Sequence, residues 1–363
     1  MIEIETSPEL IPTTMKTQAE ALVEETENQL KTVGHYRREV MPHLGPEVFL
    51  PNAGRLGWYS ACALGAIGAF AAIAFLDLPW PLKLLCGLFI GLCNGTMGFV
   101  VHELFHGSVT KNVKLQEFIG FFGLMPFLLA PTYWKHSHNK LHHGKTQQII
   151  RDPDAFPTLR IYKSSKFIQF MFPFTPGSGR KRSLLYFFFW FSFHNLVAQV
   201  WLRFRNGNFD SMNQRRSTIE FVAQVMIMSA LLAVAGPANW LYVLVIPFMA
   251  QNYLLMSYIS TNHNLSPLTN ENDPLVNSLS VTNHPVLEWL NLNFGYHVEH
   301  HLFPTVSGKH TKTIHKELVR LYPDTYKVMP KGQAMRALYK TARIYKSSNK
   351  LVHPETHELF DTI

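Results

Sequence analysis

The first half of the chain carries two long apolar runs separated by a short polar turn. Residues 56–76 and 84–101 contain no charged side chain, and each run approaches the roughly 20 residues that a spanning helix needs. Between them lies the turn 77–81, in which two prolines and Trp80 are typical of a membrane interface. The pattern therefore predicts a helical hairpin across a membrane.

A second apolar stretch lies further along the chain. Residues 221–270 contain no Asp, Glu, Lys or Arg, and the pair Gly236-Pro237 breaks this stretch. The break leaves room for two more spans, at about 221–236 and 239–259. We therefore expect a second membrane hairpin.

Two further apolar runs, 118–134 and 183–202, are flanked by basic residues at both ends. By the positive-inside rule each run then starts and ends on the cytoplasmic side, so we expect both to be interfacial or re-entrant. The flanking basic residues are Lys111, Lys114, Lys135, Lys140 and Lys145 for the first run, and Arg180, Lys181, Arg182, Arg203 and Arg205 for the second.

Composition agrees with a membrane protein. Only 16% of the 363 residues are charged, against about 25% in soluble domains, and 47% are apolar. The chain is too apolar for a disordered protein and, with 3 Cys, too poor in cysteine for a disulfide scaffold. A large soluble core is the alternative. The predicted fold class is all-α integral membrane, with four transmembrane helices in two hairpins, interfacial helices and a cytosolic histidine-rich metal-binding cap.

This topology divides the chain into three parts. Residues 1–54 form an N-terminal cytosolic segment, in which 1–30 is a polar tail, and residues 55–306 form the membrane-embedded part. Residues 307–363 form a C-terminal cytosolic segment that contains a helix over 307–321. The helix caps the metal site, docks the electron donor or is a plain surface helix. Both termini are expected in the cytoplasm.

Histidine is the second unusual feature, with 18 copies. His102 and His106 follow the second span in the sequence HELFH, and their spacing of four places them on one helical face. Alone, HELFH matches the zinc metalloprotease signature, in which Glu103 is the general base. A membrane zinc protease is therefore an alternative of a different class.

Two more histidine clusters follow. In the first, His138 and His142 share a helical face and His143 lies about 100° further round, an arrangement that suits two neighbouring metals. In the second, the spacing of three and four residues places His297, His300 and His301 on one face. A single histidine, His263, follows the fourth span.

The predicted topology places all these histidines on the cytoplasmic face. Nine imidazoles exceed the four ligands of one tetrahedral zinc, and they fit two metals with four or five ligands each. Imidazole suits zinc, copper, iron and nickel, and open positions on a redox metal indicate oxygen chemistry, so we favour iron. The predicted ligands are His102, His106, His138, His142, His143, His263, His297, His300 and His301.

Two further histidines are weaker candidates for metal binding. His136 either binds metal or contacts the ligands or solvent. His194 lies in a Phe-rich segment, and we expect it to be a hydrogen-bonded interfacial residue.

At these motifs the chain resembles the membrane fatty-acid desaturase superfamily. The three boxes HxxxH, Hx(2–3)HH and Hx(2)HH correspond to His102–His106, His138–His143 and His297–His301, and the resemblance covers about residues 56–305. It implies a non-haem di-iron centre on the cytosolic side, with His263 at the place of a further family ligand. Asp152 and Asp154 also resemble a family feature and are candidates to orient ligand imidazoles, with a plain Asp-Pro turn as the alternative. Glu103, Glu299 and His136 are further candidates for contacts of this kind.

The resemblance also implies a function. It predicts O2-dependent oxidation of an unactivated C–H bond of a fatty acyl chain, most simply desaturation. Relatives with the same boxes instead hydroxylate lipids, ketolate carotenoids or decarboxylate free fatty acids to 1-alkenes, and HELFHG departs from the HDxGH of many acyl-lipid desaturases. The substrate is a free acid, an acyl-thioester or a lipid-bound chain. Electrons come from a separate donor such as ferredoxin or cytochrome b5, since no fused haem-binding motif is present. No nucleic-acid partner is expected.

Overall fold

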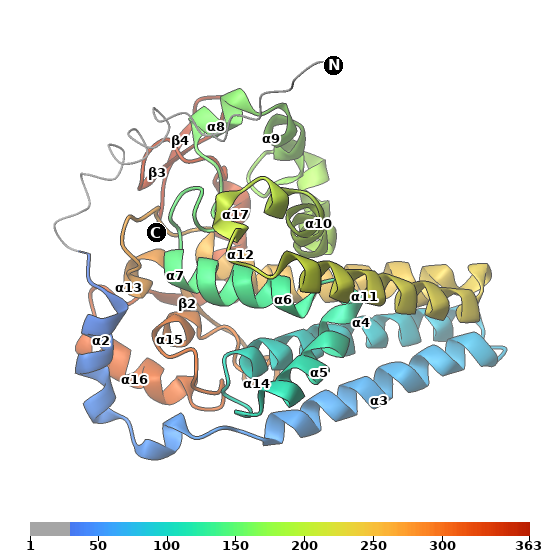
Figure 1. Cartoon of the computed structure of the whole chain (residues 1–363). Helices are drawn as coiled ribbons and strands as arrows, with labels where there is room; N and C mark the ends of the chain where they lie inside the picture. Colours follow the sequence, from blue (N-terminus) through green and yellow to red (C-terminus); the bar gives the residue numbers. More distant parts are fainter. Residues whose placement is uncertain (1–29) are drawn as a thin grey trace, which may run out of the picture.

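The computed structural model describes residues 30–363 (Figure 1). The predicted N-terminal tail lies almost entirely outside the described residues. The fold is mostly helical, as predicted, and long apolar helices form one end of it.

Four long helices form a layer of two hairpins (Figure 1). The first hairpin is α3 (Gly54–Phe75) and α4 (Trp80–Phe105). The second is α11 (Gln214–Ala235) and α12 (Ile246–His263), which a single π-helical turn, Leu241–Val245, precedes. Gly236, with φ +74, ends α11 in a conformation that glycine adopts without strain. These helices coincide with the four predicted spans.

The helices α4 and α12 pack closely because small residues line their contact. A Cβ added to Gly91 would lie 2.6 Å from the Cβ of Ala250 and 2.7 Å from the carbonyl oxygen of Pro247. Such small residues let two membrane helices approach each other. This contact brings the C-terminal ends of α4 and α12, which carry His102 and His263, to the same end of the layer.

The first of the two predicted interfacial runs is a sharply bent helix pair. The helix α5 (Val113–Leu124) and a short turn are followed by α6 (Pro131–Trp134), η5 (Lys135–His142) and α7 (His143–Lys145). The two halves meet at 95°, a geometry that fits either a re-entrant segment or a broken span.

The second run forms α10 (Tyr186–Val200), which lies above the four-helix layer in Figure 1. With its flanking turns it reaches from Lys181 to Phe204, and by length and composition it is also able to cross a membrane. Within residues 30–363, five helices are long and apolar enough to cross a membrane, or six if the bent pair is one span, where four spans were expected.

Within the described residues, four short strands join the helices, and the mostly helical fold remains consistent with the expected all-α class. Strand β1 (Ser280–Thr282) pairs in parallel with β2 (Val328–Pro330), and β3 (Lys350–Val352) pairs antiparallel with β4 (Leu359–Asp361). The remaining helices are α2 (Val33–Val40), α8 (Leu159–Ser164), α9 (Lys166–Met171), α13 (Pro274–Asn277), α14 (Pro285–Leu290), α15 (His297–Leu302), α16 (Thr311–Leu321) and α17 (Lys331–Lys340). The 3₁₀ turns are Met41–His43, Pro46–Phe49, Met125–Phe127, Phe172–Phe174, Lys181–Leu185, Leu202–Phe204, Gly207–Phe209 and Pro237–Asn239.

The C-terminal segment is part of the core. The predicted helix of 307–321 is α16, and its buried Ile314 and Leu318 belong to the same apolar cluster as Val298 and Leu302 of α15. Further on, the hydroxyl of the buried Tyr345 donates to the carbonyl oxygen of Ser266, in the loop after α12, at 2.6 Å. This packing attaches the C-terminal segment to α15 and to the loop after α12, close to the elements that carry the histidines.

Candidate metal centre

The nine predicted histidines converge in two neighbouring groups. Within each group one ring nitrogen of every histidine lies within 4.8 Å of the others. The five-histidine group consists of His102, His106, His138, His143 and His300. The four-histidine group consists of His142, His263, His297 and His301.

In the four-histidine group the nitrogens surround one point. The Nε2 atom of His263 lies 3.2 Å from that of His142, 2.8 Å from that of His297 and 3.2 Å from that of His301. One imidazole nitrogen carries either one proton or one lone pair, so it satisfies at most one of these three contacts by a hydrogen bond. Two nitrogens that each lie about 2.0–2.1 Å from a shared metal are about 2.9–3.4 Å apart, close to the observed spacing. The donor set thus fits a metal ion.

The five-histidine group shows the same convergence. The Nε2 atom of His143 lies 3.1 Å from those of His138 and His300. Among residues 30–363, His102 has no hydrogen-bond partner for either ring nitrogen, and neither has the Nε2 atom of His106, although these atoms are buried. Buried polar atoms in proteins are nearly always paired, so orphaned nitrogens beside three other imidazoles also fit a metal ion.

A π-helix distributes the second box between the groups. The segment Lys135–His142 is π-helical, with hydrogen bonds to the fifth residue in place of the fourth. His138 and His143, five residues apart, therefore belong to one group, and His142 belongs to the other. The rings of His138 and His142 stack with their centroids 5.2 Å apart, as expected for residues on one helical face, yet the two residues belong to different groups.

The third box is also divided. His297 and His301, four residues apart on α15, belong to the four-histidine group, whereas His300 belongs to the five-histidine group. The last residue of α12 supplies His263, and the end of α4 supplies His102 and its neighbour His106. Each group thus combines residues from at least three separate elements.

Hydrogen bonds support the four-histidine group from outside. The Nδ1 atom of His142 lies 3.0 Å from Oδ1 of Asp152 and 3.5 Å from Oδ2 of Asp154. The backbone N–H of Gln147 donates to the other oxygen of Asp152 at 2.8 Å. The Nδ1 atom of His301 lies 3.3 Å from the hydroxyl of Thr146. Such contacts fix which imidazole nitrogen remains available to a metal.

The protonation states of these side chains suit the binding of a cation. Burial raises the pKa of Asp152, but His142 and the backbone amides of Asp154 and Gln147 lower that pKa by more, so the carboxyl stays ionised. Burial, together with the neighbouring imidazoles, lowers the pKa of His297, His300 and His301 well below its usual range. These histidines are therefore neutral, which is the form that binds metals.

Glu103 is held away from the histidines. Its carboxylate pairs with the Arg55 guanidinium at 3.0 Å and accepts a hydrogen bond from the Ser307 hydroxyl at 2.7 Å, and both Arg55 and Glu103 are buried. Both contacts occupy the carboxylate that a zinc protease would use as its general base. The arrangement does not favour a zinc protease that uses HELFH.

Two other candidates also bond elsewhere. Glu299, though it lies within the third box, accepts hydrogen bonds from Ser280 and Tyr326, both at 2.5 Å. The Nε2 atom of His136 lies 2.8 Å from the carbonyl oxygen of Asn208. These contacts stabilise the surroundings of the boxes and do not orient the nine histidines directly.

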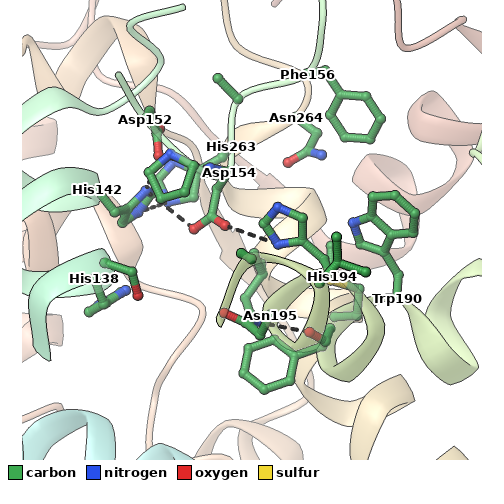
Figure 2. A pocket seen from close by; sticks show the side chains of 18 of the residues that line it. His138, His142, Asp152, Asp154, Phe156, Trp190, His194, Asn195, His263 and Asn264 are labelled. Atoms are coloured by element: carbon green, nitrogen blue, oxygen red, sulfur yellow. Dashed lines mark hydrogen bonds and ion pairs between the residues drawn. The ribbon is translucent and has the colours of Figure 1, made fainter. Parts of the chain in front are cut away.

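A cavity of about 700 Å³ reaches the histidines from the side of α10. His138, His142 and His263 line it at one end, and Trp190 and His194 of α10 line it further away (Figure 2). Most of its wall is apolar, as is typical of sites for an extended hydrophobic ligand.

Sequence reasoning missed the position of His194. It lines the cavity, with its Nδ1 atom 4.0 Å from Asp154, and Asp154 in turn reaches His142 (Figure 2). The only signal in the sequence was a polar residue in an otherwise apolar helix, which does not specify what the residue faces.

Comparisons with known proteins agree with this site. A family model described as "Fatty acid desaturase" matches residues 78–332. An omega-6 fatty acid desaturase of Spinacia oleracea, named chloroplastic, is 20% identical over 87% of this chain and 71% of its own length. An acyl-lipid (8-3)-desaturase of Thraustochytrium is 23% identical over 70% of this chain and 61% of its own length. An sn-1 acyl-lipid omega-3 desaturase (ferredoxin) of Synechocystis is 29% identical over 33% of each chain.

The chain spans less than two thirds of the length of the second and third of these relatives. The family match, however, covers most of the chain and contains all three histidine boxes, the apolar helices α4, α11 and α12 and every residue that lines the cavity except Ile344. The protein is therefore a membrane-associated oxidoreductase that belongs to the fatty acid desaturase family.

Proposed function

We propose that the nine histidines hold two iron ions and that the protein uses O2 to introduce a double bond into a fatty acyl chain. The observation that carries this proposal is the convergence of nine imidazoles into groups of five and four. Imidazole ligands suit iron, and two groups whose ligand atoms are all imidazole nitrogens are a poor match for iron–sulfur clusters, calcium or magnesium.

Bound iron would supply the oxidising power needed to remove hydrogen from an unactivated methylene. The protein contributes the geometry. Asp152 and Thr146 hold His142 and His301 in one orientation, and the apolar wall of the cavity aligns an extended chain beside the histidines. The same wall excludes water from the reacting carbon atoms.

We further propose the membrane arrangement. The helices α3, α4, α11 and α12 span the bilayer, α10 and the bent pair lie at the cytoplasmic interface, and the histidines and both termini face the cytoplasm. The basic residues at both ends of the 118–134 and 183–202 runs support this arrangement. Electrons would come from a separate small donor protein, and the ferredoxin named for one relative is a suitable class.

Lipid analysis of a producing host tests the proposed reaction. Cells that express the wild-type chain should accumulate lipids with a new internal double bond, detected by gas chromatography with mass spectrometry. Cells that express His300→Ala should not. Hydroxylated lipids or volatile 1-alkenes in place of the new double bond would contradict desaturation, and full turnover by His300→Ala would contradict the site.

A further inference from the structure

His194, on the Phe-rich helix α10, has a ring that faces a carboxylate inside the cavity (Figure 2). Its Nδ1 atom lies 4.0 Å from Oδ1 of Asp154, and the other oxygen of Asp154 lies 3.5 Å from Nδ1 of His142. The side chains of His194 and Asp154 are 24% and 31% exposed, and both form part of the cavity wall. Three side chains therefore connect the wall on α10 to the four-histidine group.

Buried amide side chains fix α10 on both sides of His194. The Oδ1 atom of Asn252, on α12, accepts a hydrogen bond from the backbone N–H of Ser192 at 2.9 Å. The Oε1 atom of Gln199 accepts one from the backbone N–H of Ala130, just before α6, at 2.8 Å. Both amide side chains are fully buried, and satisfied buried hydrogen bonds of this kind make a packing arrangement rigid. His194 is thus held at a fixed place relative to α12 and to the start of α6.

The two aspartates beside His142 are held in different ways. The side chain of Asp152 is 1% exposed, and it accepts hydrogen bonds from the backbone N–H groups of Gln147 and Asp154, at 2.8 Å and 3.0 Å. The carboxylate of Asp154 has longer contacts, with His142 and His194. A carboxylate beside an apolar wall is costly without a partner. The direction in which Asp154 points therefore depends on His194.

The length of the His194–Asp154 contact is compatible with such a dependence. At 4.0 Å the contact is too long for a direct hydrogen bond, but one bridging water molecule spans this distance at nearly the strength of a direct bond. The surrounding wall is mostly apolar, so the attraction between an imidazole N–H group and a carboxylate is screened less than in water. The contact is therefore able to hold the carboxylate in one direction.

We propose that His194 is a positioning residue, which holds the Asp154 carboxylate toward His142 and so fixes one imidazole of the four-histidine group. The proposal rests on the metal ions of the proposed function, and it adds a residue outside the three histidine boxes. Asp154 lies with His142 and Asp152 in one group of close ligand atoms, so the effect should be confined to the four-histidine group. A direct partner of a ligand changes metal affinity about 10- to 100-fold, and His194 acts through one further residue, so we expect a change of about twofold to fivefold.

Titration with Co(II) tests this role without any turnover. The full-length protein is purified in micelles without metal, and the absorption of bound Co(II) is followed in two backgrounds, His106→Ala for the four-histidine group and His263→Ala for the five-histidine group. His194→Leu should lower the affinity of the four-histidine group about twofold to fivefold and shift its Co(II) absorption band, with the five-histidine group unchanged. His194→Asn, which returns an N–H group at the place of Nδ1, should restore the affinity and the band. An unchanged affinity and band in His194→Leu would overturn the proposal.

Asn195→Leu is the matched control, because Asn195 follows His194 on α10, also lines the cavity and donates to the carbonyl oxygen of Phe191 at 2.8 Å. It should leave both cobalt sites unchanged. Equal changes in Asn195→Leu and His194→Leu would overturn the proposal, since they would indicate a general repacking of α10. In an Asp154→Asn background His194→Leu should have no further effect, and an undiminished effect there would also overturn the proposal.

Lipid analysis of the producing host separates this proposal from the proposed function. If wild-type cells form the new double bond while His194→Leu leaves the Co(II) affinity and band unchanged, the positioning role is wrong and the proposed function stands. If the cobalt results are as expected but wild-type cells form no new double bond, the proposed function is wrong and the positioning role stands.

Discussion

The two histidine groups differ in how their rings are held. In the four-histidine group three rings have a contact on the nitrogen that points away from the centre, with Asp152 for His142, Thr146 for His301 and the carbonyl oxygen of Asn277, at 3.5 Å, for His263. Within the described part of the chain, no comparable bond is found for the five-histidine group. Three members of that group, His106, His138 and His143, are also partly exposed.

This difference indicates two ways to build a metal site. The four-histidine group has fewer rings, but its buried hydrogen bonds fix their orientation in advance. The five-histidine group has one ring more, and it depends on the packing of the helices that carry the rings. The buried Arg55–Glu103 pair joins α3 to the end of α4 that carries His102. The two sites should therefore respond differently to mutation.

The largest effect should come from removing one ligand in each group. His263→Ala and His106→Ala should each abolish oxidation, because both metals are needed, yet each should lower the iron content from about two to about one per chain. Elemental analysis of the purified variants gives this count. Loss of both metals from either variant would show that the two groups form one site, and would contradict the proposed difference between them.

Loss of the Arg55–Glu103 pair should be the next largest effect. Arg55→Ala leaves a buried carboxylate without its partner, and the free energy of unfolding should fall by about 3–5 kcal/mol. Denaturant unfolding in micelles measures the change. The double variant Arg55→Met/Glu103→Leu, which removes both charges, should recover most of the loss. Arg55→Ala should also lower the metal affinity of the five-histidine group more than that of the four-histidine group.

Asp152→Asn should act on the other group. The amide keeps the shape of the side chain but removes the charge beside His142, so the metal affinity of the four-histidine group should fall about 10- to 100-fold. Titration of the metal-free protein with Fe(II) or a spectroscopic substitute such as Co(II) measures both sites. Thr146→Val, which removes only a neutral contact to His301, should weaken the same site less. Equal weakening of both sites by Asp152→Asn would contradict the difference in support.

The smallest effect concerns Lys331 of α17, which packs against α12, the helix that ends in His263. Its ammonium group lies 2.8 Å from the Ser257 hydroxyl and 3.2 Å from the centre of the Tyr258 ring, and burial lowers its pKa to about 7. The unfolded chain keeps this lysine protonated up to about pH 10.4, so folding stability should rise as the pH increases from about 7 to about 10. Lys331→Met should remove part of this rise, as measured by thermal unfolding at several pH values. The same rise in Lys331→Met as in the exposed control Lys340→Met would contradict the assignment.

Much of the fold follows from the sequence because its signals are local. Charge-free runs and the Gly236-Pro237 break correctly predicted α3, α4, α11 and α12 as long apolar helices. The interfacial placement of the bent pair and of α10 stays a prediction, because by length and composition both are also able to cross a membrane. The histidine boxes pointed to the residues that the structure brings together.

Other features depend on contacts between distant residues or on the local type of helix, which such patterns do not contain. The π-helical turns that separate His142 from His143 look like an ordinary helix in the sequence. The role of Glu103 is decided by Arg55, 48 residues earlier in the chain. The C-terminal strands and the burial of Tyr345 depend on packing against the loop after α12, so the segment after 307 looked like a separate surface element.

Metal stoichiometry of the wild-type protein is the most direct test of the central claim that two histidine groups hold two iron ions. Protein purified under anaerobic conditions should contain about two iron atoms per chain, and the ligand variant His263→Ala should contain about one. A wild-type protein with one zinc atom and no iron per chain would contradict the account.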